Sequence, residues 1–183
     1  ASQADFTCDN ITYTEGFPSF DLYFKGEKQC RFTLSVPGLH NVSNALAAIA
    51  CARLCSLPDS AIAEGLSQFR GVCRGFEFKG RSNGALVYDD YAHHPHEVSV
   101  TFDAARGMNP KRIIAVLEPH TFTRLHDFLD DFATALKKAD IAIITPVYAA
   151  REQNTTGITG HDLSGKIPGA IAFDSFTEID EYV

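Results

Sequence analysis

The sequence has no surplus of positive charge, which excludes one large class of ligand. It contains 16 Lys and Arg against 23 Asp and Glu, for a formal net charge of −7. Proteins that bind nucleic acid through its phosphates need clustered Lys and Arg. We therefore expect no nucleic-acid partner, and any anionic ligand has to be held by a few local groups.

Long apolar runs are also missing. The longest, at residues 45–52, is far shorter than the roughly 20 residues that a membrane-spanning helix needs. Residues 1–10 have neither a basic start nor the apolar centre of a signal peptide. We expect no membrane insertion, and the sequence carries no signal for the oligomeric state.

Paired cysteines are lacking as well. The five cysteines are odd in number, and none forms the C-x-x-C pair that is typical of zinc or redox sites. This speaks against a disulfide framework and favours reduced thiols in a cytoplasm. Cys51 and Cys55 lie one helical turn apart and could share a metal, but in an Ala-rich helix we expect them to be buried.

The chain does have enough apolar sequence for a core. Its 183 residues, 45% of them hydrophobic, suffice for one domain or one and a half. Alternation in residues 20–24 and 30–36 predicts a β-hairpin, and helical spacing follows in residues 42–54 and 58–69. We interpret this half as the tail of a larger domain, with no complete sheet for its helices to cover.

From residue 85 onward, strand and helix patterns alternate. Apolar runs at 85–88, 112–117, 141–145 and 170–173 are separated by helical patterns at 95–107 and 125–136, and residues 177–183 continue the alternation. Because crossovers between parallel strands are right-handed, this order predicts an α/β fold with a mainly parallel, doubly wound sheet. We expect the boundary between the two halves in the polar, Gly-rich residues 74–84.

Two polar clusters stand where a predicted strand passes into a helix. They are Asp89-Asp90-Tyr91-Ala92-His93-His94-Pro95 and Glu118-Pro119-His120-Thr121-Phe122-Thr123-Arg124. In a parallel sheet such turns meet at the carboxyl edge, where ligands bind. Carboxylates, imidazoles and a guanidinium at one edge predict a site for an anionic small molecule.

The first cluster has simpler interpretations too. Asp89 and Asp90 could bind magnesium, position a ribose or only repel each other at the surface, and adjacent strand residues point to opposite faces, so one of them faces the site. His93 and His94 lack a matched third ligand, so hydrogen bonding is favoured over metal coordination.

In the second cluster, His120 and Arg124 lie four residues apart around a helix start. There the backbone N–H groups and the guanidinium can together hold a carboxylate or a phosphate. The alternative is an exposed arginine in a salt bridge. Two such turns on neighbouring crossovers favour the site.

Three further segments carry polar residues with more than one interpretation. Asn41 can cap the first helix, whereas Asn44 in its first turn offers a donor and an acceptor suited to a purine edge. Arg74 is either a solvated charge at a hinge or a phosphate clamp. Residues 160–166 have the spacing of a phosphate loop, but Ile167 stands where Ser or Thr is required and no apolar strand precedes them, so we reject them as a nucleotide site.

Taken together, these segments resemble the Mur ligases, ATP-dependent enzymes that attach amino acids to UDP-muramic acid in peptidoglycan synthesis. The matching segments are residues 37–48 (G-x-H-N-x-x-N-A-L-A-A), 89–97 (D-D-Y-[AG]-H-H-P-x-E), 119–124 (P-H-[RT]-[YF]-T-R) and 147–152 (V-Y-x-A-x-E). They occur in order along nearly the whole chain and are most similar to the alanine-adding branch of the family.

The resemblance implies a three-domain ligase of which this chain is a piece. Residues 1–75 would be the end of the central ATP-binding domain, and residues 76–183 a Rossmann-like C-terminal domain lacking its final strand and helix. The family's phosphate loop and magnesium-binding residues are absent here, so we expect the chain alone to be inactive. The whole protein would use ATP, Mg²⁺, UDP-N-acetylmuramate and L-alanine in the bacterial cytoplasm.

Roles are implied by position within the matched motifs. ATP binding falls on His40, Asn41, Asn44, Arg74 and Asp90. The wall around the muramoyl carboxylate and the incoming alanine falls on Tyr91, His93, His94, His120 and Arg124. Asp90, His93 and Arg124 are the implied catalytic residues, and no metal ligand is implied.

One position departs from the family pattern. Where the family has Arg-Arg-Phe, this chain has Arg74-Gly75-Phe76, so either Arg74 takes over the γ-phosphate clamp or this copy is impaired. Because of Gly75, a second hypothesis remains, in which the protein is a non-catalytic relative that binds a nucleotide or a peptide. A ligase that attaches a whole tripeptide to the same sugar is a near alternative, and a metal-dependent hydrolase built on the histidines is a distant one.

Overall fold

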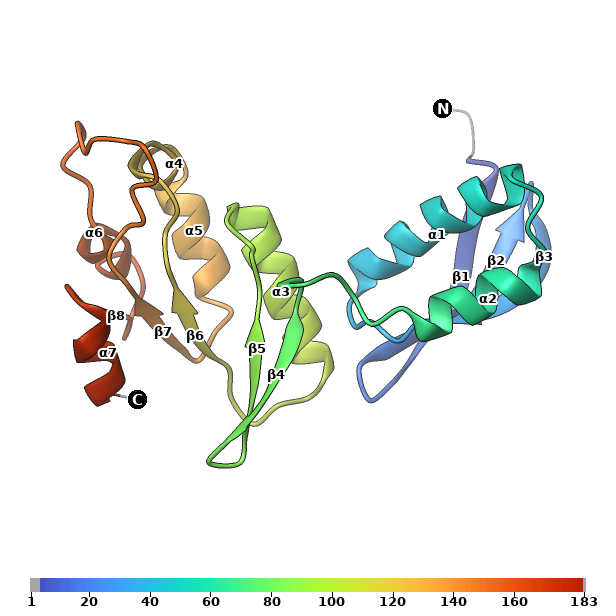
Figure 1. Cartoon of the computed structure of the whole chain (residues 1–183), viewed down its shortest axis with the longest axis horizontal. Coiled ribbons are helices and arrows are strands. Elements are labelled where there is room, and N and C mark those ends of the chain that lie inside the picture. Colours follow the sequence, from blue (N-terminus) through green and yellow to red (C-terminus); the bar gives the residue numbers. More distant parts are fainter. Residues whose placement is uncertain (1–3, 183) are drawn as a thin grey trace. The chain divides into compact units, whose positions relative to one another are not determined.

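The computed structural model describes residues 4–182, and Figure 1 shows their helices and strands in chain order. The chain packs as two compact units. One contains the described residues up to Asp90 together with Ala104–Asn109, and the other contains Tyr91–Asp103 and the described residues from Pro110 onward. The boundary expected between residues 75 and 76 separates two domains of a whole ligase, and these two compact units do not test it. It therefore stays a prediction.

The N-terminal half contains a three-stranded antiparallel sheet. Its strands are β1 (Phe6–Thr14), β2 (Phe17–Phe24) and β3 (Glu27–Thr33), in the order β1-β2-β3 (Figure 1). The predicted hairpin is confirmed as β2 and β3. Its turn is Lys25-Gly26, whose φ angles of 51° and 85° suit the type I′ turn that matches strand twist.

The strand β1 was not expected, and it changes the interpretation of this half. Two helices, α1 (Leu39–Leu54) and α2 (Asp59–Gln68), pack on the sheet, where α1 contacts β1 and β2 and α2 contacts β3. The expectation that these helices have no complete sheet to cover is therefore wrong, because a three-stranded sheet is present.

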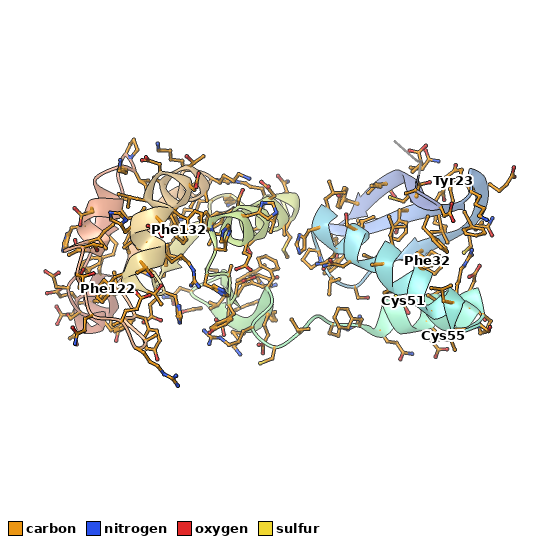
Figure 2. All side chains as sticks on the ribbon, turned by 90° about the horizontal axis from the view of Figure 1, so that it is seen from above. Tyr23, Phe32, Cys51, Cys55, Phe122 and Phe132 are labelled. Carbon is orange, nitrogen blue, oxygen red and sulfur yellow. The ribbon has the colours of Figure 1, made fainter. Side chains whose placement is uncertain are left out.

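Two cysteines that were expected in the core, one in α1 and one directly after it, are exposed. Cys51 and Cys55, labelled in Figure 2, are both exposed, whereas the buried positions of α1 are Val42, Ala45 and Ile49. A helix rich in Ala has no strongly apolar stripe, so its pattern does not tell which side is buried. The core assignment of both cysteines is wrong for this reason.

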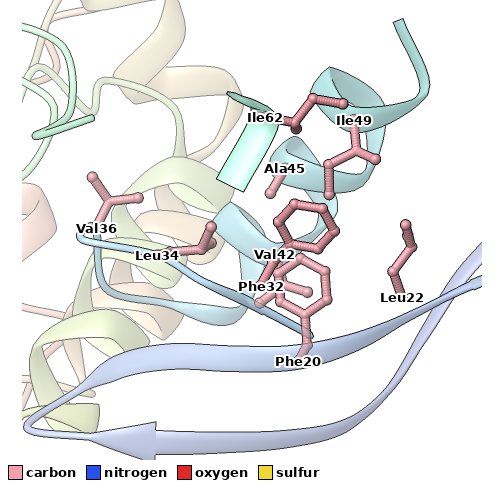
Figure 3. Close-up of a cluster of buried hydrophobic side chains, with 9 residues drawn as sticks. All are labelled: Phe20, Leu22, Phe32, Leu34, Val36, Val42, Ala45, Ile49 and Ile62. Atoms are coloured by element: carbon pink, nitrogen blue, oxygen red, sulfur yellow. The ribbon is translucent and has the colours of Figure 1, made fainter. Parts of the chain in front are cut away.

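One hydrophobic cluster holds the sheet and the two helices together, and Figure 3 shows its side chains. Phe20 and Phe32 are cross-strand partners, and their ring centroids lie 6.0 Å apart. The cluster consists of Phe20, Leu22, Phe32, Leu34, Val36, Val42, Ala45, Ile49 and Ile62. Truncating a fully buried Phe to Ala typically costs about 3–5 kcal/mol, so Phe20 and Phe32 anchor this part of the fold.

A second hairpin follows α2, in the segment where only a boundary was expected. It consists of β4 (Glu77–Ser82) and β5 (Ala85–Asp89), joined by an Asn83-Gly84 turn. The ring of Tyr88 stacks on Phe76 at 4.4 Å between centroids and meets the ring of Phe78 at a tilt, at 5.5 Å. An Asn-Gly pair between apolar residues is a strong hairpin signal, so the sequence did contain the information for this turn.

A parallel sheet supports the rest of the chain. Its strands are β6 (Ile114–Leu117), β7 (Ile141–Ile144) and β8 (Ile171–Ala172), in the order β6-β7-β8 (Figure 1). The predicted α/β fold with parallel strands is confirmed. The strand predicted at residues 85–88 differs, because β5 pairs antiparallel with β4.

The helices of this part are α3 (Pro95–Gly107), α4 (Phe122–Asp127), α5 (Leu129–Leu136), α6 (Gly160–Ser164) and α7 (Phe176–Tyr182). The single helix expected over residues 125–136 is broken at Phe128, whose φ and ψ are −116° and 25°. Along its C-terminal piece, Phe132 and Leu136 are buried (Figure 2 labels Phe132). The residues rejected as a phosphate loop lie in and just after α6. Within residues 4–182, no helix is long and apolar enough to cross a bilayer.

Candidate functional site

The turn that follows β5 holds two histidines in different environments. The Nδ1 of His93 lies 2.9 Å from the backbone oxygen of Tyr91, and the two rings meet edge to face at 5.3 Å. Since a carbonyl oxygen only accepts, His93 donates from Nδ1 and keeps its lone pair on Nε2 when neutral. His94 instead meets the ring of Phe128 at 5.0 Å, and its Nδ1 accepts the N–H of His96.

Glu97 fixes the backbone of this turn. One of its carboxylate oxygens accepts the N–H of His93 at 3.0 Å and the N–H of His94 at 3.1 Å. The hydrogen bond from the N–H of His93, followed by that from the N–H of His94, lowers the pKa of Glu97 below its usual value. Partial burial opposes this shift but does not cancel it. The carboxylate thereby caps the start of α3 and keeps the His93 ring in place.

The turn that follows β6 pairs an imidazole with a guanidinium. The Nη1 of Arg124 lies 3.1 Å from Nδ1 of His120 and 3.2 Å from the His120 backbone oxygen. A guanidinium can only donate, so His120 Nδ1 is the acceptor and its Nε2 carries the proton. His93 and His120 therefore have opposite tautomers. Nε2 of His93 carries a lone pair and can accept a proton, whereas Nε2 of His120 carries a hydrogen and can donate it.

A third segment, the loop after β7, is joined to the His120 turn. Tyr148 and His120 form a parallel bridge, in which Thr121 N–H donates to the Tyr148 oxygen at 2.9 Å and Tyr148 N–H donates to the Pro119 oxygen at 2.8 Å. Further along the loop, Glu152 accepts hydrogen bonds from the N–H and the hydroxyl of Thr123.

These three segments bring one continuous set of side chains together. The ring of His120 lies 6.0 Å from that of His93 and 5.3 Å from that of Tyr148. The set is Tyr91, His93, His120, Arg124 and Tyr148, all in the second compact unit. A guanidinium beside two imidazoles and two phenols can bind a carboxylate and exchange a proton with a bound group. We call this set the imidazole–guanidinium cluster.

One backbone N–H that was expected to face the anion already has a partner. The helix that carries Arg124 was expected to offer its first N–H groups to the ligand, but the N–H of Thr123 is bonded to Glu152. The helix α4 also has only 6 residues. An anion in the cluster would therefore not use the N–H of Thr123.

The amides expected near the nucleotide lie at the start of α1. Asn41 does not cap the helix, because the N-cap is Gly38 and Asn41 donates from its side chain to the Pro37 oxygen at 2.7 Å. Asn44 in turn donates to the Asn41 side-chain oxygen at 3.1 Å. The capping interpretation of Asn41 is wrong, and the pair forms a short polar chain along one face of α1. Burial lowers the pKa of the adjacent His40, an effect that Asp90 partly opposes.

The Arg74 segment is fastened by three carboxylates. Arg74 donates its N–H to Glu77 at 2.8 Å and its Nε to Asp89 at 3.2 Å, and Phe76 donates its N–H to Asp90 at 2.8 Å. Asp89 and Asp90 therefore both have partners in this segment. A Cβ added at Gly75 would lie 2.6 Å from Cγ2 of Val72, so the position accepts no larger residue unless Val72 moves.

Three residues of the site were not expected from the sequence: Tyr148, Glu97 and Glu152. Glu97 stands in the resembling motif, three residues after His94, a spacing that is typical of a capping carboxylate. Glu152 stands 29 residues from the Thr123 that it contacts, and no local pattern predicts such a contact.

The chain is similar over its whole length to known proteins. A family profile described as "Mur ligase, glutamate ligase domain" matches residues 74–182. A UDP-N-acetylmuramate–L-alanine ligase of Agathobacter rectalis is 43% identical over 187 residues, which cover 100% of this chain and 41% of the relative.

Two solved structures are similar as well. The crystal structure of the UDP-N-acetylmuramate–alanine ligase MurC of Thermotoga maritima matches with a TM-score of 0.84 and 25% identity, over 100% of this chain and 40% of that one. A murein peptide ligase of Psychrobacter arcticus matches with a TM-score of 0.65 and 26% identity, over 98% and 38%. The chain thus spans about two fifths of the relatives that it matches. It belongs to the Mur ligase family.

Proposed function

We propose that this chain is part of an ATP-dependent ligase that joins L-alanine to the carboxyl group of UDP-N-acetylmuramate. The observation that carries the proposal is the imidazole–guanidinium cluster, in which Arg124 lies beside His120 and His120 beside His93. The names of relatives that are about 40% identical supply the substrates. As part of the same proposal, the reaction takes place in the bacterial cytoplasm, where the five free cysteines stay reduced.

The proposed chemistry has two steps. The muramoyl carboxylate attacks the γ-phosphorus of ATP and expels ADP, giving an acyl phosphate. The amine nitrogen of alanine then attacks the acyl carbon, loses a proton and expels inorganic phosphate. Both steps build negative charge on oxygen, so the groups that matter are cations and N–H donors.

Each member of the cluster suits one part of this chemistry. Arg124 and the Nε2–H of His120 would hold the muramoyl carboxylate. The Nε2 lone pair of neutral His93 would take the proton of the alanine ammonium, with Nδ1 held by the Tyr91 oxygen. Tyr91 and Tyr148, both about half exposed, would form the walls. His94 faces Phe128, and we keep it as a candidate for the substrate side.

The nucleotide side of the proposal rests on fewer contacts. His40, Asn41, Asn44, Arg74 and Asp90 would hold ATP, which supplies the phosphoryl group. Among the residues that the structure describes, no group of three His, Cys, Asp or Glu could hold a metal ion. In ATP-dependent sites Mg²⁺ is commonly held by one or two carboxylates together with water and the nucleotide phosphates, and we propose that its protein ligands lie in the remainder of the whole protein.

The test is phosphate release by the full-length protein that contains this chain. With ATP, UDP-N-acetylmuramate and L-alanine we expect turnover, and with a whole cell-wall tripeptide in place of alanine we expect almost none. A preference for the tripeptide would favour the recycling ligase, for which the similarity to the murein peptide ligase is the supporting observation. No turnover with either would favour a non-catalytic relative. The 183-residue chain alone is expected to be inactive.

A further inference from the structure

The helix that carries Arg124 does not cap itself. Its N-cap is Thr121, which has a φ of 70° and makes no side-chain capping bond. The helix α4 has 6 residues, and isolated helices shorter than about 12 residues are marginal in water. The position of Arg124 therefore depends on contacts from outside the helix.

One such contact comes from Glu152, on the loop after β7. Its Oε2 accepts the N–H of Thr123 at 3.0 Å, and its Oε1 accepts the Thr123 hydroxyl. The Thr123 hydroxyl and then its N–H lower the pKa of Glu152 below its usual value, so the carboxylate is charged at neutral pH. A negative charge at a helix N-terminus also stabilises the helix dipole.

We propose that Glu152 is a positioning residue for substrate binding, which acts by capping α4 and so holds Arg124 against His120. The inference rests on the proposed function for its kinetic readout. Glu152 contacts Thr123 in the first turn of α4, and Arg124 lies one residue beyond Thr123, so a shift of this turn moves the guanidinium. The same carboxylate occupies the N–H of Thr123, so an incoming anion would meet Arg124 and His120 as its side-chain partners.

The fold provides a route for testing this role without unfolding the site. The backbone bonds between Tyr148 and the His120 turn do not involve the Glu152 side chain, so we expect them to persist when Glu152 is replaced. Asp162 offers a matched control. It caps α6 through the N–H and the hydroxyl of Thr159, both at 2.8 Å, and it is not part of the imidazole–guanidinium cluster.

The experiment compares Glu152→Ala, Glu152→Gln and Asp162→Ala in the full-length ligase. We expect Glu152→Ala to raise KM for UDP-N-acetylmuramate roughly fivefold or more, as the loss of a cap suggests, with KM for ATP unchanged. Glu152→Gln should recover much of this, because its amide oxygen still accepts the N–H of Thr123. Glu152→Ala and Asp162→Ala each remove a helix cap, so we expect them to lower Tm by similar amounts. Only Asp162→Ala should leave both KM values at the wild-type level.

A double variant separates positioning from general weakening. If Glu152 acts through Arg124, then Glu152→Ala combined with Arg124→Ala should raise KM no further than Arg124→Ala alone. Additive effects, or equal KM changes in Glu152→Ala and Asp162→Ala, would overturn the proposal.

A readout that does not need turnover keeps this inference apart from the proposed function. If the wild-type protein shows no ligase activity, the proposed function fails, and hydrogen exchange of the Thr123 amide still tests Glu152. Exchange there should rise at least roughly tenfold in Glu152→Ala and stay unchanged in Asp162→Ala. A Thr123 amide that remains protected in Glu152→Ala would exclude the capping role.

Discussion

The backbone N–H of Phe76 donates a hydrogen bond to the Asp90 carboxylate over 2.8 Å. Phe76 has a φ of 50° and Arg74 one of 55°, conformations that cost free energy for residues other than glycine. The carboxylates of Glu77, Asp89 and Asp90 hold this segment by its N–H groups and by the Arg74 guanidinium. A residue implied to approach the nucleotide thus also holds the segment that precedes β4.

Replacement of Asp90 should separate these two roles. Asp90→Ala leaves the partly buried N–H of Phe76 without this acceptor, which costs about 1–3 kcal/mol, and should speed hydrogen exchange at Phe76. Asp90→Asn keeps an acceptor oxygen and should largely restore protection. If Asp90→Asn nevertheless raises KM for ATP, the carboxylate charge has a nucleotide role in addition to the structural one.

Gly75 should tolerate a side chain only when Val72 is made smaller. The Cβ of Gly75→Ala would come within 2.6 Å of Cγ2 and 3.3 Å of the oxygen of Val72. We expect Gly75→Ala to lower Tm and Val72→Ala to recover part of the loss, because the methyl group in the way is then gone. Equal Tm values for Gly75→Ala with and without Val72→Ala would contradict this.

A test of the phosphate clamp also places a side chain at Gly75, so it is best made in the Val72→Ala variant. If Arg74 has taken over that role, Arg74→Ala in the full-length ligase should lower kcat more than roughly tenfold, and Gly75→Arg should restore much of it. Rescue by Gly75→Ala to the same extent would point to backbone flexibility instead.

Arg124→Ala should raise the KM values of the carboxylate substrates far more than that of ATP. A lost charge-assisted hydrogen bond is worth roughly 1.5–3 kcal/mol, or about ten- to a hundredfold in KM. Arg124→Lys is the matched control, since it keeps the charge and loses the planar fork. Steady-state kinetics on folded variants test this, and unchanged substrate constants would remove Arg124 from the site.

Asp21 should make the N-terminal half sensitive to acid. Hydrogen bonds from Lys28, Asn10 and Arg31 hold its pKa far below the usual value of 3.8. A lowered folded-state pKa gives stability that is present above the unfolded value and is lost as pH falls through the folded one. The β2 and β3 amides should lose protection below about pH 4 in the wild type and much less steeply in Asp21→Asn. Equal pH dependence in both proteins would argue against Asp21 as the source.

The cysteines should differ in their reactivity. Cys51, Cys55 and Cys73 are exposed, whereas burial raises the pKa of Cys8 and Cys30 and so lowers their thiolate fraction. A short maleimide pulse followed by peptide mass spectrometry should label the first three ahead of the other two. Protection of Cys51 and Cys55 in the full-length protein would mean that another part of it covers α1.

The local sequence pattern was sufficient to predict those elements whose formation depends on residues close together in the chain. Alternation predicted the β2–β3 hairpin, and strand–helix order predicted the parallel strands β6 and β7, because periodicity and turn chemistry act over a few residues. The same order placed His93, His120 and Arg124 at turns after strands, and these turns do meet, although β5 pairs with β4 and not with the parallel strands from which the convergence was expected.

Tertiary structure decided what depends on distant partners. Only packing shows that α1 turns Val42 and Ile49 inward and its cysteines outward, because an Ala-rich helix has no clear apolar side. The contact of the Phe128 ring with His94 and the capping of α4 by Glu152 join segments far apart in sequence, where no spacing rule applies. The histidine tautomers follow from which atom each ring nitrogen faces, a property that the folded chain alone creates.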